Sequence, residues 1–152
     1  YTTWRDYKMA KGALLEKNSG VGGLLVNVEH VTEAKTIEEK DSGKVFLLSS
    51  AGGAYDITLP TAATGQNGAV YKFVVEEETP SNDITIKAGS AIINIVVNDA
   101  GNGAASSSAG TAKSNVIIEA VSHRGDFVEL MFYGGKYYGM AMSGINDGIT
   151  TS

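Results

Sequence analysis

The last third of the chain alternates between apolar and polar residues with the two-residue period of a β-strand. In the run 127–133, one side of the alternation is uniformly large and apolar and holds Val128, Leu130 and Phe132. The other side is mixed and holds Phe127, Glu129, Met131 and Tyr133. Gly134-Gly135 follows directly, and two residues that adopt positive φ without strain fit a two-residue hairpin turn. Together with the runs 116–121 and 136–142, this pattern predicts three adjacent strands.

Six further strands are predicted upstream, each bounded by Gly, Pro, Asn or Ser residues that favour turns. They span residues 24–31, 44–48, 55–59, 69–75, 83–87 and 91–97. The run 91–97 is apolar on both sides except at Asn94, so it is either a central strand covered on both faces or a strand at a subunit contact. Helix is expected only as one turn, because Thr36-Ile37-Glu38-Glu39 matches a capping box.

Nine short strands without a helix long enough for a βαβ crossover predict an all-β fold, an antiparallel β-sandwich or jelly-roll-like single domain. The domain covers residues 24–152, and residues 1–23 precede it as an extended N-terminal arm. A chain of 152 residues buries roughly 68% of its unfolded surface on folding, which is enough for one core. The residues expected in that core are Leu47, Ile57, Leu59, Phe73, Ile84, Ile86, Ile118, Val128, Leu130 and Phe132.

Two segments follow neither strand nor helix periodicity. The arm carries large apolar residues that a soluble monomer gains little by exposing, and that are therefore predicted to be covered by another chain. These residues are Trp4, Tyr7, Met9, Leu14 and Leu15. The second segment, 99–113, is rich in Gly, Ala and Ser and lacks large apolar residues, so it is expected to be a long exposed loop. That loop is either a mobile connection or a contact that becomes ordered on assembly.

Composition excludes several classes of function. The chain has 17 acidic and 12 basic residues and a formal net charge of −5, which argues against nucleic-acid binding because phosphate neutralisation needs clustered Lys and Arg. It has no cysteine, so it cannot be a disulfide-stapled scaffold. Its longest apolar runs fall well short of about 18 residues, so neither a membrane span nor membrane binding is expected.

The search for catalytic and metal-binding patterns gives weak candidates. His30 and His123 are far apart in the sequence, and without cysteine they do not form a zinc-ligand pattern. Ser122-His123 is a neighbouring pair at a predicted strand end, but a catalytic triad needs a base that faces the nucleophile and is oriented by a third group. Glu76-Glu77-Glu78 is typical of a solvated turn rather than a calcium site. Asn98-Asp99 with Asn102 resembles half of a calcium loop but lacks the final bidentate Glu. We therefore expect no enzyme activity, no metal and no cofactor.

Arg124-Gly125-Asp126 has the composition of a cell-adhesion motif. It also joins two predicted strands, and Gly and Asp are residues that such a turn uses anyway. The turn is the favoured interpretation.

A set of short motifs, in a fixed order along residues 36–142, resembles the small β modules of tailed-phage virions. The motifs are Asp41-Ser42-Gly43-Lys44-Val45-Phe46-Leu47-Leu48, Ile57-Thr58-Leu59-Pro60-Thr61-Ala62-Ala63 with Gly65 and Gly68, Tyr71-Lys72-Phe73-Val74-Val75, Ile84-Thr85-Ile86, Ala91-Ile92-Ile93, and Gly125-Asp126-Phe127-Val128-Glu129-Leu130 through Lys136-Tyr137-Tyr138. The chain is similar in this respect to capsid decoration proteins and to related head-fibre and tail-fibre domains, particularly of marine phages. The resemblance implies a stable, non-enzymatic β-sandwich present in many copies on a particle.

Two functions follow from this resemblance. The first is a capsid decoration or cement protein on the outer surface of a phage head, present in the host cytoplasm during assembly. Its partners would be the major capsid protein, contacted by the arm, and neighbouring copies of itself, with a trimer favoured. The second is a receptor- or glycan-binding domain of a tail or head fibre, with Tyr133, Tyr137 and Tyr138 as surface contacts. Ordinary cross-strand packing is the alternative explanation for those tyrosines.

Overall fold

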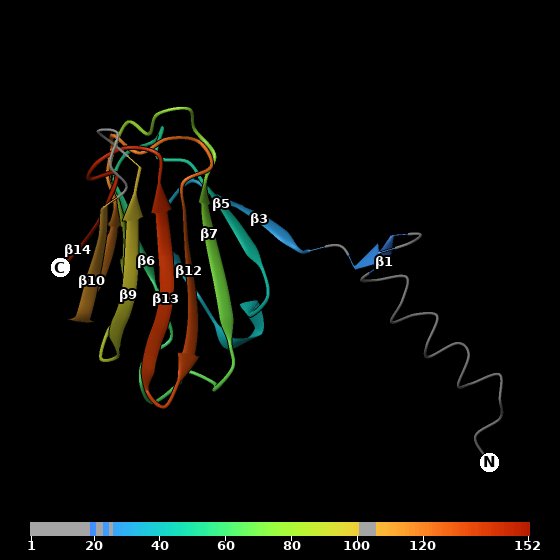
Figure 1. Ribbon diagram of the computed structural model, residues 1–152. Helices are drawn as coiled ribbons and strands as arrows, with labels where there is room; N and C mark the ends of the chain where they lie inside the picture. The colour runs from blue at the N-terminus through green and yellow to red at the C-terminus, as the bar shows by residue number, and fades with distance from the viewer. Residues whose placement is uncertain (1–18, 21–22, 25, 101–105) are drawn as a thin grey trace, which may run out of the picture.

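Each of the nine predicted strands has a counterpart in the computed structural model, which describes residues 19–20, 23–24, 26–100 and 106–152. The strands form two mixed sheets that pack against each other, so the all-β sandwich is confirmed (Figure 1). The helix within these residues is one 3-10 turn, η1, at Glu39–Asp41. Its capping box is reciprocal as expected, but it joins Glu38 to Asp41, because Thr36 ends a strand instead of starting the turn.

The larger sheet has seven strands in the order β10-β9-β13-β12-β7-β5-β3. In chain order these are β3 Val28–Val31, β5 Val45–Leu48, β7 Val70–Val75, β9 Ile92–Asp99, β10 Ser106–Lys113, β12 Phe127–Tyr133 and β13 Lys136–Ser143. The smaller sheet has five strands in the order β14-β11-β8-β6-β4. They are β4 Lys35–Thr36, β6 Tyr55–Thr58, β8 Ile84–Lys87, β11 Asn115–Ile118 and β14 Ile149–Thr151. Two further strands, β1 Ser19–Gly20 and β2 Gly23–Leu24, pair only with each other.

Strand pairing is mixed rather than antiparallel throughout. From β3 to β9 the chain alternates between the two sheets, with the odd-numbered strands in the larger sheet and the even-numbered strands in the smaller one. Neighbours such as β3 and β5, or β6 and β8, are therefore separated by one strand of the opposite layer and run parallel. The antiparallel hairpin expected at the C-terminal end is present between β12 and β13. Gly134 and Gly135 form its turn with φ of 56° and 77°.

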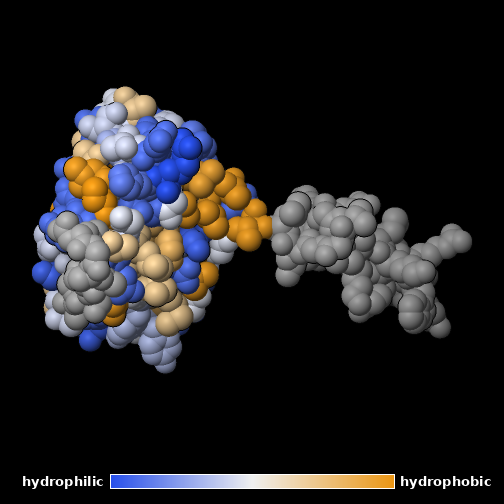
Figure 2. Space-filling view, turned by 45° about the horizontal axis from the view of Figure 1, so that its top comes forward, coloured by the Kyte–Doolittle hydropathy of each residue, from blue (hydrophilic) through white to orange (hydrophobic). Residues whose placement is uncertain are grey.

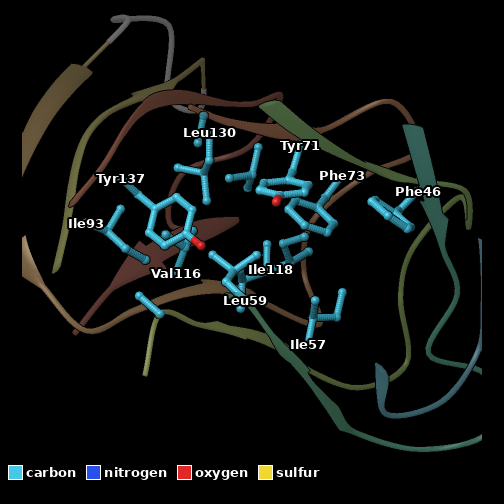
Figure 3. Packing of buried hydrophobic residues seen from close by; sticks show 14 of the residues in the cluster. Phe46, Ile57, Leu59, Tyr71, Phe73, Ile93, Val116, Ile118, Leu130 and Tyr137 are labelled. Atoms are coloured by element: carbon cyan, nitrogen blue, oxygen red, sulfur yellow. The ribbon is translucent and has the colours of Figure 1, made fainter. Parts of the chain in front are cut away.

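The core lies between the inward faces of the two sheets (Figure 3). Nine of the ten residues expected in the core are buried, and the exception is Leu47, which is only half-buried. In β5 the inward residues are Phe46 and Leu48. The sequence Val45-Phe46-Leu47-Leu48 is apolar at four consecutive positions, so it gives no information about which alternate set faces inward.

The segment predicted as a long loop contains a strand instead. β10 pairs antiparallel with β9 from Ser106 to Lys113, with a register shift after Gly110. The shift coincides with a positive φ of 54° at Ala112, as in a β-bulge. β10 forms an edge of the larger sheet and is held by backbone hydrogen bonds to a single neighbour, so it can form without the large apolar residues whose absence suggested a loop.

Candidate binding surface

The outward side of the larger sheet carries most of the exposed apolar side chains of the described protein. We call the outward-facing residues of β9, β13, β12, β7, β5 and β3 the large-sheet face; Figure 1 looks onto the part of it formed by β9, β13, β12 and β7. Eight large apolar residues on this face are 41% to 61% exposed: Val28, Val70, Val96, Met131, Tyr133, Tyr138, Met140 and Met142. Of the large apolar side chains that are exposed in the described residues, only Val26 and Val121 lie elsewhere.

Strand register arranges these side chains in continuous rows across the sheet. In one row Met142, Phe127, Val74 and Leu47 are direct cross-strand neighbours on β13, β12, β7 and β5. In another, Tyr138, Met131 and Val70 follow one another on β13, β12 and β7. Side chains directly opposite each other on adjacent strands are about 5 Å apart, so each row is one continuous apolar strip.

The outward side of the smaller sheet has a different composition. Its described residues are mainly polar or charged: Asp56, Thr58, Thr85, Lys87, Asn115, Ile117 and Thr150. Lys87 Nζ donates to Asp56 Oδ2 at 2.6 Å across this surface. A sandwich in water normally has polar residues on both outer surfaces, so the large-sheet face is the unusual one. Figure 2 shows hydrophobic residues of the body reaching the surface among hydrophilic ones.

An ion pair lies near the middle of the large-sheet face. Lys72 on β7 and Glu129 on β12 are cross-strand neighbours, with 3.6 Å between Nζ and Oε2. The Lys72 ammonium also lies 4.6 Å from the centroid of the Phe127 ring. Beside this pair is a shallow hollow of about 310 Å³, lined by Val70, Glu129, Leu130, Met131, Tyr138, Gly139 and Met140. The hollow and the ion pair together mark the middle of the large-sheet face.

The three tyrosines proposed as surface contacts have different environments. Tyr133 is 61% exposed and Tyr138 is 41% exposed, both on the large-sheet face. Tyr137 is fully buried, so its assignment as a surface contact is wrong. It points into the core, and its hydroxyl donates to the carbonyl oxygen of Pro60 at 2.6 Å. Burial raises its pKa above the ordinary value. The strand alternation that exposes Tyr138 necessarily turns Tyr137 inward.

Asp126 of the Arg124-Gly125-Asp126 sequence is part of the fold. Its carboxylate is buried and accepts hydrogen bonds from the His123 amide, the Ser143 hydroxyl and the Gly144 amide, at 2.8 to 2.9 Å. Gly125 has a φ of 93°, which the turn requires. An adhesion receptor needs an accessible Asp carboxylate, so the interpretation as a turn is confirmed.

The weak catalytic candidates do not assemble into a site. The Ser122 hydroxyl is buried without a hydrogen-bond partner, while His123 is exposed, so no base activates this serine. The Glu77 carboxylate accepts from Ser49, Ser50 and the Ala51 amide. Burial raises the pKa of Glu77, but these hydrogen bonds outweigh it and the net pKa is lowered. The structure thus gives Glu77 a structural role at the Ser49–Ala51 turn.

Acidic residues approach one another where β9 ends. Asp99 Oδ1 is enclosed without a hydrogen-bond partner. The pKa of Asp99 is raised above its ordinary value, mainly by burial. A hydrogen bond from the Asp147 backbone lowers this pKa, and the nearby carboxylates of Asp147 and Asp126 raise it. Within the residues that the structure describes, no group of three or more His, Cys, Asp or Glu side chains is arranged to hold a metal ion.

No family model matches the chain, and no curated protein matches it. Among the described residues, no helix is long and apolar enough to cross a membrane.

The arm residues Trp4, Tyr7, Met9, Leu14 and Leu15 lie outside the described residues, as does Asn102. Their proposed contacts remain predictions.

Proposed function

We propose that this chain is a virion structural protein, a decoration or cement protein that binds the outer surface of a phage head and stabilises the shell. The observation that carries the proposal is the large-sheet face, where eight large apolar side chains are exposed on one side of a single sheet. Exposed apolar area of this extent is typical of proteins that are covered by other chains. The order of the motifs along residues 36–142 supports a phage particle as the assembly in question.

Such a protein would stabilise the shell by mass action. A protein that binds only the assembled, expanded shell shifts the equilibrium toward that shell by an amount that grows with its concentration relative to its dissociation constant. The arm is the segment that we expect to contact the major capsid protein, because Trp4, Tyr7 and Leu14 are large apolar residues without a periodicity of their own. A sandwich body anchored in this way needs no catalytic residues and no cofactor.

The test uses purified virions of the phage that encodes the chain. We expect mass spectrometry to find the chain in many copies per particle and cryo-electron microscopy to place it on the outside of the head. Heads stripped of the chain should release DNA at a lower temperature, and re-addition should restore the original temperature. A chain that is absent from virions, or that is confined to the tail, would contradict the proposal.

A fibre domain that binds a receptor or glycan is the second candidate. The observation that favours it is the exposure of Tyr133 and Tyr138 near the Gly134-Gly135 turn, because flat aromatic side chains at a surface are suited to stacking on sugar rings. Glycan-array binding by the purified chain, lost in Tyr133→Ala and Tyr138→Ala and retained in Val121→Ala, would favour this function. The three positions are all exposed, so the substitutions should leave the core unchanged.

A further inference from the structure

We propose that two copies of this chain pack face to face through the large-sheet face, related by a two-fold axis. The inference concerns the chain itself and does not depend on the particle or receptor that it serves. It is carried by three properties of the face: its area, the position of its charges, and the match between its two halves under two-fold symmetry.

The area of the face is close to what a stable dimer requires. Six strands contribute to it, and strands spaced about 4.8 Å apart with about six residues each cover on the order of 500–600 Å² in flat projection. The side chains that rise from this plane increase the accessible area further. Specific interfaces bury about 800 Å² on each partner. The face is also rich in Met and Tyr, which interface cores favour, and it holds three of the four methionines of the chain.

The central charges complement themselves. Lys72 and Glu129 lie side by side on β7 and β12, with three strands on the β7 side and four on the β12 side. A two-fold axis in the contact plane, running along the strands between these two residues, exchanges their positions in the second copy. Each Lys72 then lies opposite Glu129 of the other copy. Glu129 is the only carboxylate among the outward-facing residues of the described strands from β9 to β3. Glu76, which directly follows β7, is paired with His30 on the same face, so both of these carboxylates have a basic neighbour.

The same axis sets apolar side chains of one copy against apolar side chains of the other. Residues at the same height on β12 and β7, or on β13 and β5, exchange places, because each pair is equally distant from the axis. The resulting contacts are Met131 with Val70, Phe127 with Val74, and Met142 with Leu47 of the second copy. No polar side chain is set against an apolar one in these three contacts.

The hollow beside the ion pair is suited to receive a side chain of the second copy. It lies over β12 and β13, and its lining includes the outward-facing residues Glu129, Met131 and Tyr138. A pocket at the centre of an interface is where the residues that dominate binding energy are usually found.

The proposed two-fold pair differs from the trimer expected from the sequence. A three-fold axis joins two different patches of neighbouring copies, whereas the large-sheet face complements itself around Lys72 and Glu129. A face covered by a capsid protein would need no such self-complementarity. The following experiment distinguishes the dimer from a trimer, and from a monomer whose face is left for a capsid protein.

The experiment measures the association of the full chain at micromolar concentrations by sedimentation velocity and light scattering. We expect a dimer for the wild type, and a dissociation constant at least about tenfold higher for Met131→Lys. Val121→Lys is the matched control, because Val121 is 48% exposed and lies in a turn outside the face. It should dimerise like the wild type. Near-ultraviolet circular dichroism at low concentration confirms that each variant is folded.

Charge exchange tests the two-fold arrangement itself. Lys72→Glu and Glu129→Lys should each weaken the dimer at least about tenfold, because each brings like charges together twice across the axis. The double variant should restore it. If the ion pair acted only within its own chain, these variants would change the melting temperature and leave the dissociation constant of the dimer unchanged. That result would contradict the two-fold arrangement. The proposal would be overturned by a monomeric or trimeric wild type, or by a Met131→Lys variant that dimerises normally. Particle binding by the variant does not enter this test, so the dimer and the proposed function can fail separately.

Discussion

Two fully buried tyrosines offer a matched pair of substitutions, of which only one should lower the free energy of unfolding. Tyr137 on β13 and Tyr71 on β7 are both at most 1% exposed, and both point from the larger sheet into the core (Figure 3). The Tyr137 hydroxyl donates to the Pro60 carbonyl oxygen at 2.6 Å. The Tyr71 hydroxyl is buried without a hydrogen-bond partner. Replacing each by Phe removes one oxygen atom and keeps the ring.

The magnitudes follow from what each hydroxyl loses. Tyr137→Phe keeps the edge contact with the Phe132 ring, whose centroid is 5.0 Å away, but leaves the buried Pro60 carbonyl without this donor. An unsatisfied buried polar group costs about 1–3 kcal/mol, so the free energy of unfolding should fall by that amount. Tyr71→Phe removes a hydroxyl that is shielded from solvent in the folded state and has no hydrogen-bond partner there. The free energy of unfolding should therefore stay constant or rise by about 1 kcal/mol.

The assay is thermal and urea unfolding at pH 7, followed by far-ultraviolet circular dichroism, for the wild type and both variants. A change of 1 kcal/mol shifts the midpoint of a domain of this size by roughly 3 °C, so Tyr137→Phe should melt about 3–9 °C lower and Tyr71→Phe at or above the wild-type midpoint. If Tyr71→Phe lost as much stability as Tyr137→Phe, the Tyr71 hydroxyl would have a partner, such as an enclosed water, and the reasoning would be refuted.

Three further predictions concern the core, the acidic end of β9 and the arm. Leu130→Ala should lower the free energy of unfolding by roughly 2–5 kcal/mol through lost burial and a cavity, because Leu130 is fully buried; a loss below about 1 kcal/mol would contradict its place in the core. Asp99→Asn should raise stability at pH 7, because the raised pKa of Asp99 means that its charged form destabilises the folded state. The gain should shrink as the pH falls through the raised pKa and disappear below the ordinary value of 3.8, and a gain independent of pH would exclude the charge as its cause. Deleting residues 1–20 should leave the melting temperature nearly unchanged, since the described core cluster begins at Val31, while capsid binding weakens at least about tenfold, or 1.4 kcal/mol; full occupancy of heads by the truncated chain would assign anchoring to the body instead.

Local pattern was sufficient to predict most of the strands, but among their partners only those of the β12–β13 hairpin. The run 127–133 alternates clearly, so both its existence and its inward face were predictable. β5 is apolar at four consecutive positions, and there the inward face was not predictable. β4 and β14 have only two and three residues, too few for a period to be visible. The parallel neighbours, such as β9 beside β13, are set by the winding of the chain between layers, which no local pattern records.

The candidate surface was also partly visible in the sequence, because the alternation within a single strand shows which residues share one side. The mixed side of 127–133 already held Phe127, Met131 and Tyr133, and the run 91–97 was apolar on both sides. Each was a signal for a covered outer face. The sequence does not show that these two runs belong to one face, because the continuity of the face depends on β13 lying between β9 and β12. The alternation along Lys136–Ser143 separates Tyr137, which faces the core, from Tyr138, which faces outward.

The winding between layers also explains why the two outer surfaces of the described sandwich differ in composition. Because successive strands from β3 to β9 are assigned alternately to the two sheets, the outward residues of each layer come from separate parts of the sequence and can differ in composition. The smaller sheet presents charged and hydroxyl-bearing residues, such as the Lys87–Asp56 pair, whose exposure to water costs nothing. The larger sheet presents Met, Val and Tyr side chains that are stabilised by removal from water. In the dimer that we propose, this difference places the two smaller sheets toward solvent and the two large-sheet faces against each other.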